Sequence, residues 1–82
     1  IYEGQWMNDK KNGKGMMTYS DGIIYEGEWK YNIREGHGRM TFPNGDKYEG
    51  EWRNNTRTGQ GTYTYSNGDI KEGEWKKGIF IS

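Results

Sequence analysis

The segment YEGQW at Tyr2–Trp6 recurs as YEGEW at Tyr25–Trp29 and Tyr48–Trp52, and as KEGEW at Lys71–Trp75. Successive copies begin 23 residues apart. A period of about 20 to 50 residues is typical of a repeat array, in which function belongs to a surface rather than to a catalytic pocket. We therefore expect residues 1–82 to form one array. Its units are residues 2–24, 25–47 and 48–70 and a partial unit at 71–82.

The composition indicates a folded chain that is held together by aromatic side chains. Only 29% of the 82 residues are hydrophobic, but 16% are aromatic and the formal net charge is zero, so the composition is not that of a disordered chain. The 12 basic and 12 acidic residues leave no basic excess for binding phosphates, and we expect no nucleic-acid partner. The absence of cysteine favours an intracellular, cytoplasmic location.

The sequence predicts no membrane span and no signal peptide. No apolar run approaches the ~20 residues that cross a bilayer, and no signal-peptide pattern opens the sequence, so we expect a soluble chain. The sequence begins at Ile1, inside the repeat register, and breaks off within a fourth unit. We therefore expect it to be a piece of a longer protein.

Two turn signals alternate along the chain. The pair Asn8-Asp9 and its equivalents follow each tryptophan segment and predict a two-residue hairpin turn. Ser20-Asp21-Gly22 and its equivalents predict a type I turn that glycine closes with a bulge. The segments between them are rich in Tyr, Trp, Thr and Met and lack a helical stripe. Each unit therefore reads as a β-hairpin, and the chain as an all-β, antiparallel meander of about seven strands.

Counting outward from the turns predicts the register. A two-residue turn at Asn8-Asp9 places Trp6 opposite Lys11, and further counting places Gly4 opposite Gly13 and Tyr2 opposite Gly15. A three-residue turn at 20–22 pairs Tyr19 with Ile23 and Met17 with Tyr25. Alternation then gathers the aromatic side chains and the glycines on one face. The glutamates lie on the other face, with predicted cross-strand pairs of Glu3 with Lys14, Glu26 with His37 and Glu49 with Gln60.

The pattern of YEGEW, two turn residues, a GxG pair, an aromatic residue and DG or NG resembles the MORN repeat (membrane occupation and recognition nexus). The resemblance covers the whole chain and implies an elongated, twisted, single-layer sheet of stacked hairpins with an aromatic groove. It also implies scaffolding, protein binding, dimerisation or association with a membrane or the cytoskeleton, and no enzymatic activity. The pattern departs at Lys71 and at 78–81, where we expect either a cap or an exposed apolar end.

The residues that could carry chemistry are few. His37 is the only histidine, and we interpret it as a surface residue because Lys14 and Gln60 occupy the same position in other repeats. One histidine and no cysteine cannot supply a zinc site or a nucleophile–base pair. Glutamates in successive repeats are roughly 9.5 Å apart, too far to share a cation. We therefore expect no catalytic residue, no metal and no cofactor.

Function is expected at the aromatic face, because a single-layer sheet has no second layer to cover it. The residues expected to support a groove for a protein partner are Tyr2, Trp6, Tyr25, Trp29, Tyr48, Trp52 and Trp75. The rings could instead pack only on each other and on glycine. Self-association through edges or faces is a further alternative.

Basic residues near the two-residue turns suggest a second kind of site. Lined along one long edge, they could meet acidic phospholipids, at up to ~1 kcal/mol each. The candidates are Lys10, Lys11, Lys14, Arg34 and Arg57. The alternative is a solvated edge that prevents aggregation, and Lys11, Arg34 and Arg57 could serve cation–π stacking on the tryptophans that they face.

Overall fold

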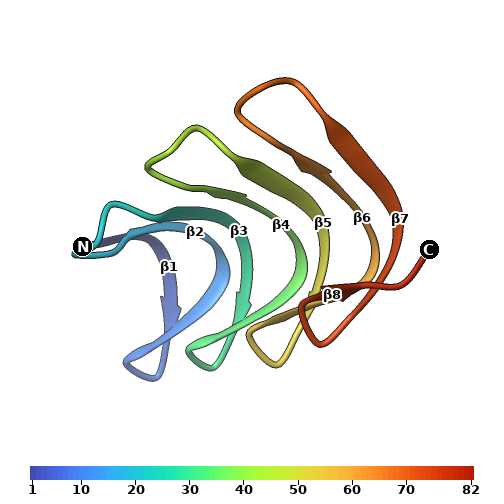
Figure 1. Ribbon diagram of the computed structural model, residues 1–82. Helices are drawn as coiled ribbons and strands as arrows, with labels where there is room; N and C mark the ends of the chain where they lie inside the picture. The colour runs from blue at the N-terminus through green and yellow to red at the C-terminus, as the bar shows by residue number, and fades with distance from the viewer.

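The computed structural model describes residues 1–82, which form one antiparallel sheet of eight strands in sequence order (Figure 1). The strands are β1 (Tyr2–Met7), β2 (Lys10–Thr18), β3 (Ile24–Lys30), β4 (Ile33–Thr41), β5 (Lys47–Arg53), β6 (Thr56–Thr64), β7 (Ile70–Lys76) and β8 (Ile79–Phe80). The predicted all-β meander is confirmed, with a short eighth strand beyond the seven expected. The chain forms no helix that is long and apolar enough to cross a membrane.

Both predicted turns are confirmed. Asn8 and Asp9 have φ angles of 52° and 65°, the left-handed pair that a type I′ hairpin turn requires. At the other end of the hairpin, Gly22 has a φ of 94°, and the Tyr19 amide donates a hydrogen bond to the Ile23 carbonyl at 2.9 Å. The turns at one end therefore join the two strands of a repeat, and the turns at the other end join consecutive repeats.

The register within each hairpin differs from the prediction. Trp6 lies opposite Lys11 as expected, but Gly4 lies opposite Gly15, so a bulge places Gln5 against three residues of β2. The same shift recurs between β3 and β4 and between β5 and β6. Because the bulge adds two residues, it preserves the alternation of side chains, and the predicted faces survive the wrong register.

The predicted cross-strand ion pairs are wrong for the same reason. The structure instead pairs Glu3 with Met16, Glu26 with Arg39, and Glu49 with Thr62. The one ion pair within 4.0 Å joins His37 to Glu49 at 3.8 Å, between exposed side chains. Such a contact adds little to stability.

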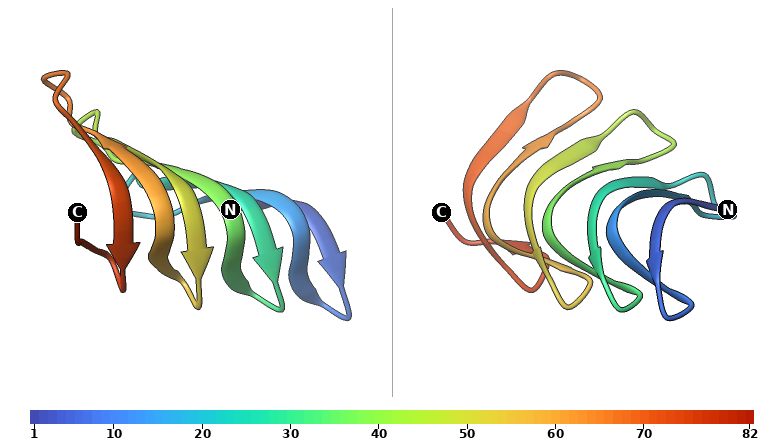
Figure 2. Two further views of the ribbon diagram at one scale, coloured as in Figure 1. Left: turned by 90° about the vertical axis from the view of Figure 1, so that its right-hand side faces the viewer. Right: turned by 180° about the vertical axis from the view of Figure 1, so that it is seen from behind.

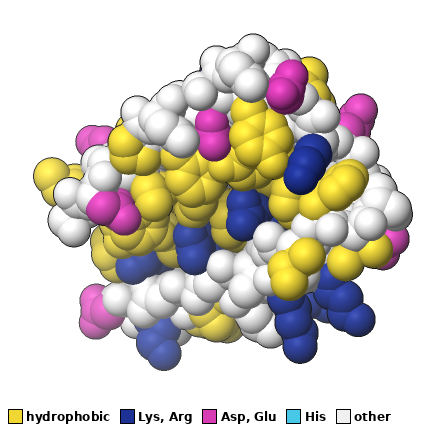
Figure 3. Space-filling view, viewed as in Figure 1, with side chains coloured by type: hydrophobic (Ala, Val, Ile, Leu, Met, Phe, Trp, Pro, Cys, Tyr) yellow, Lys and Arg dark blue, Asp and Glu magenta, His cyan; other side chains and the backbone are white.

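The sheet bows strongly along its strands, and the hairpins curve together around one concave face (Figure 2). The molecule measures 39 × 23 × 15 Å along its principal axes, so it is elongated. Hydrophobic side chains gather in the hollow of this concave face (Figure 3). The buried core is correspondingly small and consists of Tyr25, Trp29, Met40, Tyr48, Trp52 and Trp75. A single layer thus buries rings by curving around them.

The departures at the C-terminal end form part of the fold. Phe80 in β8 packs against Trp75, with ring centroids 5.2 Å apart. It supplies a ring next to Lys71, which stands where the other repeats have tyrosine, and Lys71 Nζ lies 5.8 Å from the Phe80 centroid. Phe80 thus caps the aromatic row, while Ile79 and Ile81 on either side are exposed.

Candidate functional site

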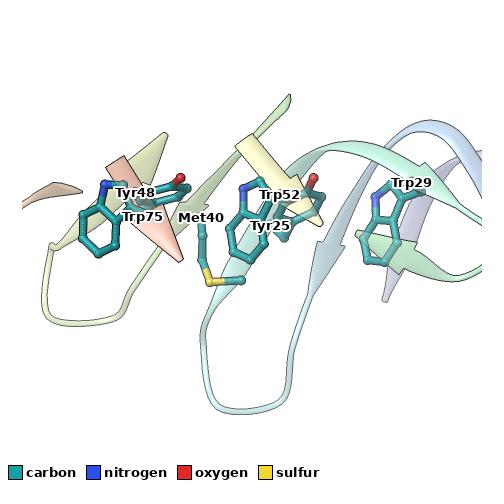
Figure 4. Packing of buried hydrophobic residues seen from close by; sticks show 6 residues of the cluster. All are labelled: Tyr25, Trp29, Met40, Tyr48, Trp52 and Trp75. Carbon is teal, nitrogen blue, oxygen red and sulfur yellow. The ribbon is translucent and has the colours of Figure 1, made fainter. Parts of the chain in front are cut away.

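A continuous ladder of aromatic rings lies on the concave face, and Figure 4 shows its buried rings together with Met40. Each tyrosine of the YEGQW and YEGEW segments packs edge to face between the tryptophan of its own repeat and that of the next. Tyr25, for example, lies 5.1 Å from Trp29 and 5.2 Å from Trp52 between ring centroids. Such pairs contribute ~0.5–1.5 kcal/mol each beyond area burial, so the ladder couples neighbouring repeats.

Hydrogen bonds fix the polar atoms of the ladder. Trp52 Nε1 donates to the Gly38 carbonyl at 3.2 Å, and Trp29 and Trp75 make the equivalent bond one repeat away. The Tyr25 hydroxyl donates to the Glu28 carbonyl at 2.9 Å. A Cβ atom on Gly38 would collide with the Tyr25 ring, which explains the glycine at this position. The YEGEW segment is therefore primarily a structural motif.

The seven rings predicted to support a groove differ in accessibility. Tyr25 and Tyr48 are fully buried, and Trp29, Trp52 and Trp75 are each 5% exposed. Trp6, at the start of the ladder, is 56% exposed and Tyr2 is half-buried. Five of the seven thus present almost no surface to a partner, and they pack on each other and on glycine.

Other rings of the concave face are only partly covered. These lie toward the three-residue turns, are half-buried, and comprise Tyr19, Phe42, Tyr63 and Tyr65. Below them is a pocket of about 270 Å³, lined among others by Arg34, Met40, Phe42 and Arg57. The alternation of the strands places the four rings on the correct face, but the sequence did not single out these rings as a site. We call this half-buried band and the pocket below it the groove.

Three basic side chains lie on the aromatic face rather than on the predicted basic edge, and two of them, Arg34 and Arg57, line the pocket of the groove. Lys11, Arg34 and Arg57 lie opposite the tryptophans across their hairpins, as predicted. Each also extends over a ring of the next repeat, and the Arg34 guanidinium carbon lies 5.0 Å from the Trp52 centroid. Figure 3 shows dark-blue side chains in a row below the hydrophobic band.

The other two predicted basic residues lie elsewhere. Lys10 is exposed beside the first two-residue turn. Lys14 is exposed on the polar face, where it lies opposite Glu28 of the next repeat. The predicted basic set is therefore divided among the groove, the turn edge and the polar face. The prediction of one continuous basic edge that contains all five residues is wrong.

Asp46 holds one wall of the groove in place. Its Oδ2 accepts a hydrogen bond from the Tyr63 hydroxyl at 2.9 Å, and its Oδ1 accepts one from the Ser66 amide at 2.8 Å. Burial opposes the charge on Asp46, but these hydrogen bonds outweigh it, and the pKa of this carboxyl lies below its usual value. Ile23 and Asp69 occupy the equivalent positions, so the period offered no signal for this contact.

Burial also perturbs the tyrosines. It raises the pKa of Tyr48 to about 12, against a smaller opposing effect from the nearby Arg57 charge. Burial and the hydrogen bond to Asp46 raise the pKa of Tyr63 to about 12. The pKa of Tyr25 is raised further, again chiefly by burial. These hydroxyls are therefore neutral hydrogen-bond donors at ordinary pH and are poorly suited to act as bases.

The second acidic position of the repeat motif serves the backbone. Glu28 Oε1 accepts a hydrogen bond from the His37 amide at 2.8 Å, beside Gly36 with a φ of 100°. Gln5 Oε1 and Glu51 Oε1 accept the equivalent bonds in the other hairpins. Each side chain caps an amide of the bulge. Across the chain, no group of three or more His, Asp or Glu side chains is arranged to hold a metal ion.

The repeating units match the model of a known protein family. The MORN repeat model matches residues 2–24, 25–47, 48–70 and 72–80, which together span nearly the whole chain. No curated protein matches the sequence.

Proposed function

The chain belongs to the MORN repeat family, and from this premise we propose that it is a non-catalytic scaffold that binds a protein partner in its groove. The MORN repeat is a non-enzymatic module of a kind that generally mediates protein or membrane interactions. The observation that carries the proposal is the half-buried band of Tyr19, Phe42, Tyr63 and Tyr65 above a row of cations that have no ion-pair partner. Accessible aromatic surface beside arginine is typical of binding sites.

Selection from a random peptide library displayed on phage tests the proposal. Peptides selected on the 82-residue chain are expected to lose most of their affinity for the Phe42→Gln variant, which removes a groove ring. Thr41→Gln is the matched control, because Thr41 neighbours Phe42 but lies on the polar face. Circular dichroism establishes that both variants fold. If no peptide is enriched, or if the two variants bind equally well, the proposal is wrong.

A peripheral membrane module is the second candidate. Met7 and Tyr31 are each about half exposed beside Lys10 and Lys30 near the two-residue turns, a mixture that suits a membrane interface. Vesicles that contain phosphatidylserine should then sediment the chain at low salt and release it at high salt. Lys10→Gln together with Lys30→Gln should weaken sedimentation more than the matched neutralisation Arg39→Gln on the polar face. An absence of sedimentation at low salt contradicts this candidate.

Self-association is the third candidate, and the exposed Trp6 on edge strand β1 favours it. Static light scattering over a range of concentrations tests it, because the apparent mass of an associating chain rises with concentration. A constant monomer mass counts against dimerisation. For all three candidates, we propose an intracellular, cytoplasmic protein that acts at a protein scaffold, the cytoskeleton or a membrane.

A further inference from the structure

Three cations on the aromatic face have no acidic partner. The single ion pair of the chain joins His37 and Glu49 on the polar face, so no carboxylate lies within 4.0 Å of Lys11, Arg34 or Arg57. Each cation extends over an aromatic ring of the next repeat, at 5.5, 5.0 and 5.3 Å from the centroids of Trp29, Trp52 and Trp75 respectively. Stacking occupies the flat face of a guanidinium and leaves its N–H edges free to donate.

Hydrogen bonds within the chain use only part of this donor capacity. Arg34 donates from Nε and Nη2 to Asn55. Arg57 donates from Nη2 to the Gly78 carbonyl at 3.1 Å, and Lys11 Nζ donates no hydrogen bond to the chain. The two arginines are thus fixed in place while Nη1 of each has no acceptor. A fixed guanidinium with a free edge is well suited to a carboxylate.

The spacing between Lys11, Arg34 and Arg57 favours one backbone conformation in a bound partner. Equivalent residues are two strands apart, roughly 9.5 Å. A polyproline II helix returns to the same face every three residues, after about 9.3 Å. In a β-strand, a residue three positions on faces the opposite way, and positions two and four apart are at about 6.6 and 13.2 Å. An α-helix returns to nearly the same face after seven residues, at about 10.5 Å. Of these three conformations, polyproline II matches the spacing of the cations best.

We infer that the groove binds a proline-rich segment in the polyproline II conformation that carries an acidic residue at every third position. This inference rests on the proposed function and specifies its partner. The acidic side chains pair with Lys11, Arg34 and Arg57, and the segment lies across the strands. The intervening residues contact the half-buried rings, since aromatic-lined grooves suit polyproline II segments.

Fluorescence anisotropy with labelled synthetic peptides tests the inference. The probe contains four Pro-Pro-Glu triplets. One control has the same composition with all glutamates in a block at one end, and another has glutamine in place of glutamate. We expect the triplet peptide to bind at least about tenfold more tightly than either control, because only its charges match the spacing of the row. Equal binding of the triplet and block peptides would overturn the inferred spacing.

Substitutions locate the binding site. Lys11→Gln, Arg34→Gln and Arg57→Gln should each weaken binding of the triplet peptide about fivefold, and Arg34→Lys should recover part of the loss because it keeps the charge. Arg39→Gln is the matched control, since Arg39 lies on the same strand as Arg34 but on the polar face. Lys11→Gln keeps the test decisive if the arginine variants fail to fold. An equal loss in Arg39→Gln would exclude the groove as the site.

The outcomes separate this inference from the proposed function. If library-selected peptides bind in a Phe42-dependent manner but the triplet peptide does not bind, the inference falls and the groove remains a protein-binding site. If neither binds, both fall. If phosphatidylserine vesicles bind in a Lys11-dependent manner and the triplet peptide does not, the row recognises lipid headgroups and the inference is wrong.

Discussion

Trp52 and Trp6 occupy the same position of the repeat in different surroundings. Trp52 is 5% exposed and donates Nε1 to the Gly38 carbonyl, whereas Trp6 is largely exposed and donates no such bond. We expect Trp52→Phe to lower the free energy of unfolding by about 1–3 kcal/mol, because a buried carbonyl loses its partner. Trp6→Phe should change it by less than about 0.5 kcal/mol. Urea denaturation measures both, and equal effects would contradict a structural role that depends on burial.

The roles of single residues were only partly visible in the sequence. Alternation of the strands placed the tryptophans, the tyrosines and Arg34 on one face, because a period of two survives the bulge. The function of Glu28 was missed, because an acceptor for a backbone amide and a surface charge look alike in a sequence. The one signal in the sequence was Gln5, which stands where later repeats have glutamate. Glutamine keeps the acceptor oxygen at this position without the charge. Asp46 had no signal, because its contact with Tyr63 depends on how the sheet bends.

At the scale of the element, the two-residue turn between β3 and β4 is the least favourable of its kind. Tyr31 has a φ of 50°, a left-handed conformation that bulky residues rarely adopt, and the equivalent position in two other turns is asparagine. Tyr31→Asn should therefore raise the free energy of unfolding by about 0.5–1 kcal/mol. Asn54→Tyr in the next hairpin is the reciprocal control and should lower it by a similar amount. Thermal denaturation checks both, and a destabilised Tyr31→Asn would show that the exposed ring supports the fold.

Hairpins were the best-predicted elements. The signals at Asn8-Asp9 and at 20–22 gave both turn types, since few residues tolerate a positive φ. The register beyond Trp6 was wrong, because Gly13 in a bulge and Gly13 in a regular strand give the same pattern. In the structure, the Gln5 side chain accepts a hydrogen bond from the Lys14 amide across the bulge, a contact that counting from the turn does not include. Counting from the two-residue turn therefore gives the correct pairing of the two strands only as far as the bulge.

At the scale of the molecule, the curvature of the sheet divides the predicted sites. A flat sheet would expose all seven predicted rings, whereas the bowed sheet encloses most of them and leaves the band near the three-residue turns accessible (Figures 2 and 3). The same bend brings Arg34 from a predicted edge into the groove. The 23-residue period predicts that equivalent residues of successive repeats are aligned in a row. It does not reveal whether that row lies at an edge of the sheet or in its concave face. The sequence therefore placed the seven rings on the correct face of the sheet but did not show how deeply most of them are buried.

The tyrosines whose pKa the fold raises predict how the whole array responds to alkali. In an unfolded chain a tyrosine titrates near pH 10, whereas the pKa values of Tyr48 and Tyr63 in the fold are raised to about 12. A raised pKa favours the folded state fully below pH ~10, and this contribution is lost as pH rises through the folded pKa. The free energy of unfolding should therefore stay level from about pH 8 to 10 and fall between about pH 10 and 12.

Urea titrations across this range, together with near-ultraviolet absorbance of tyrosinate, measure the effect. Tyrosinate from the buried rings should appear together with the loss of native circular dichroism, because ionisation requires the ladder to open. Tyr48→Phe is the matched variant. It should lower stability at pH 8, since the bond to the Glu51 carbonyl is lost, but it should flatten the decline above pH 10. A decline as steep as that of the unsubstituted chain would mean that Tyr48 is already accessible to solvent in the folded array.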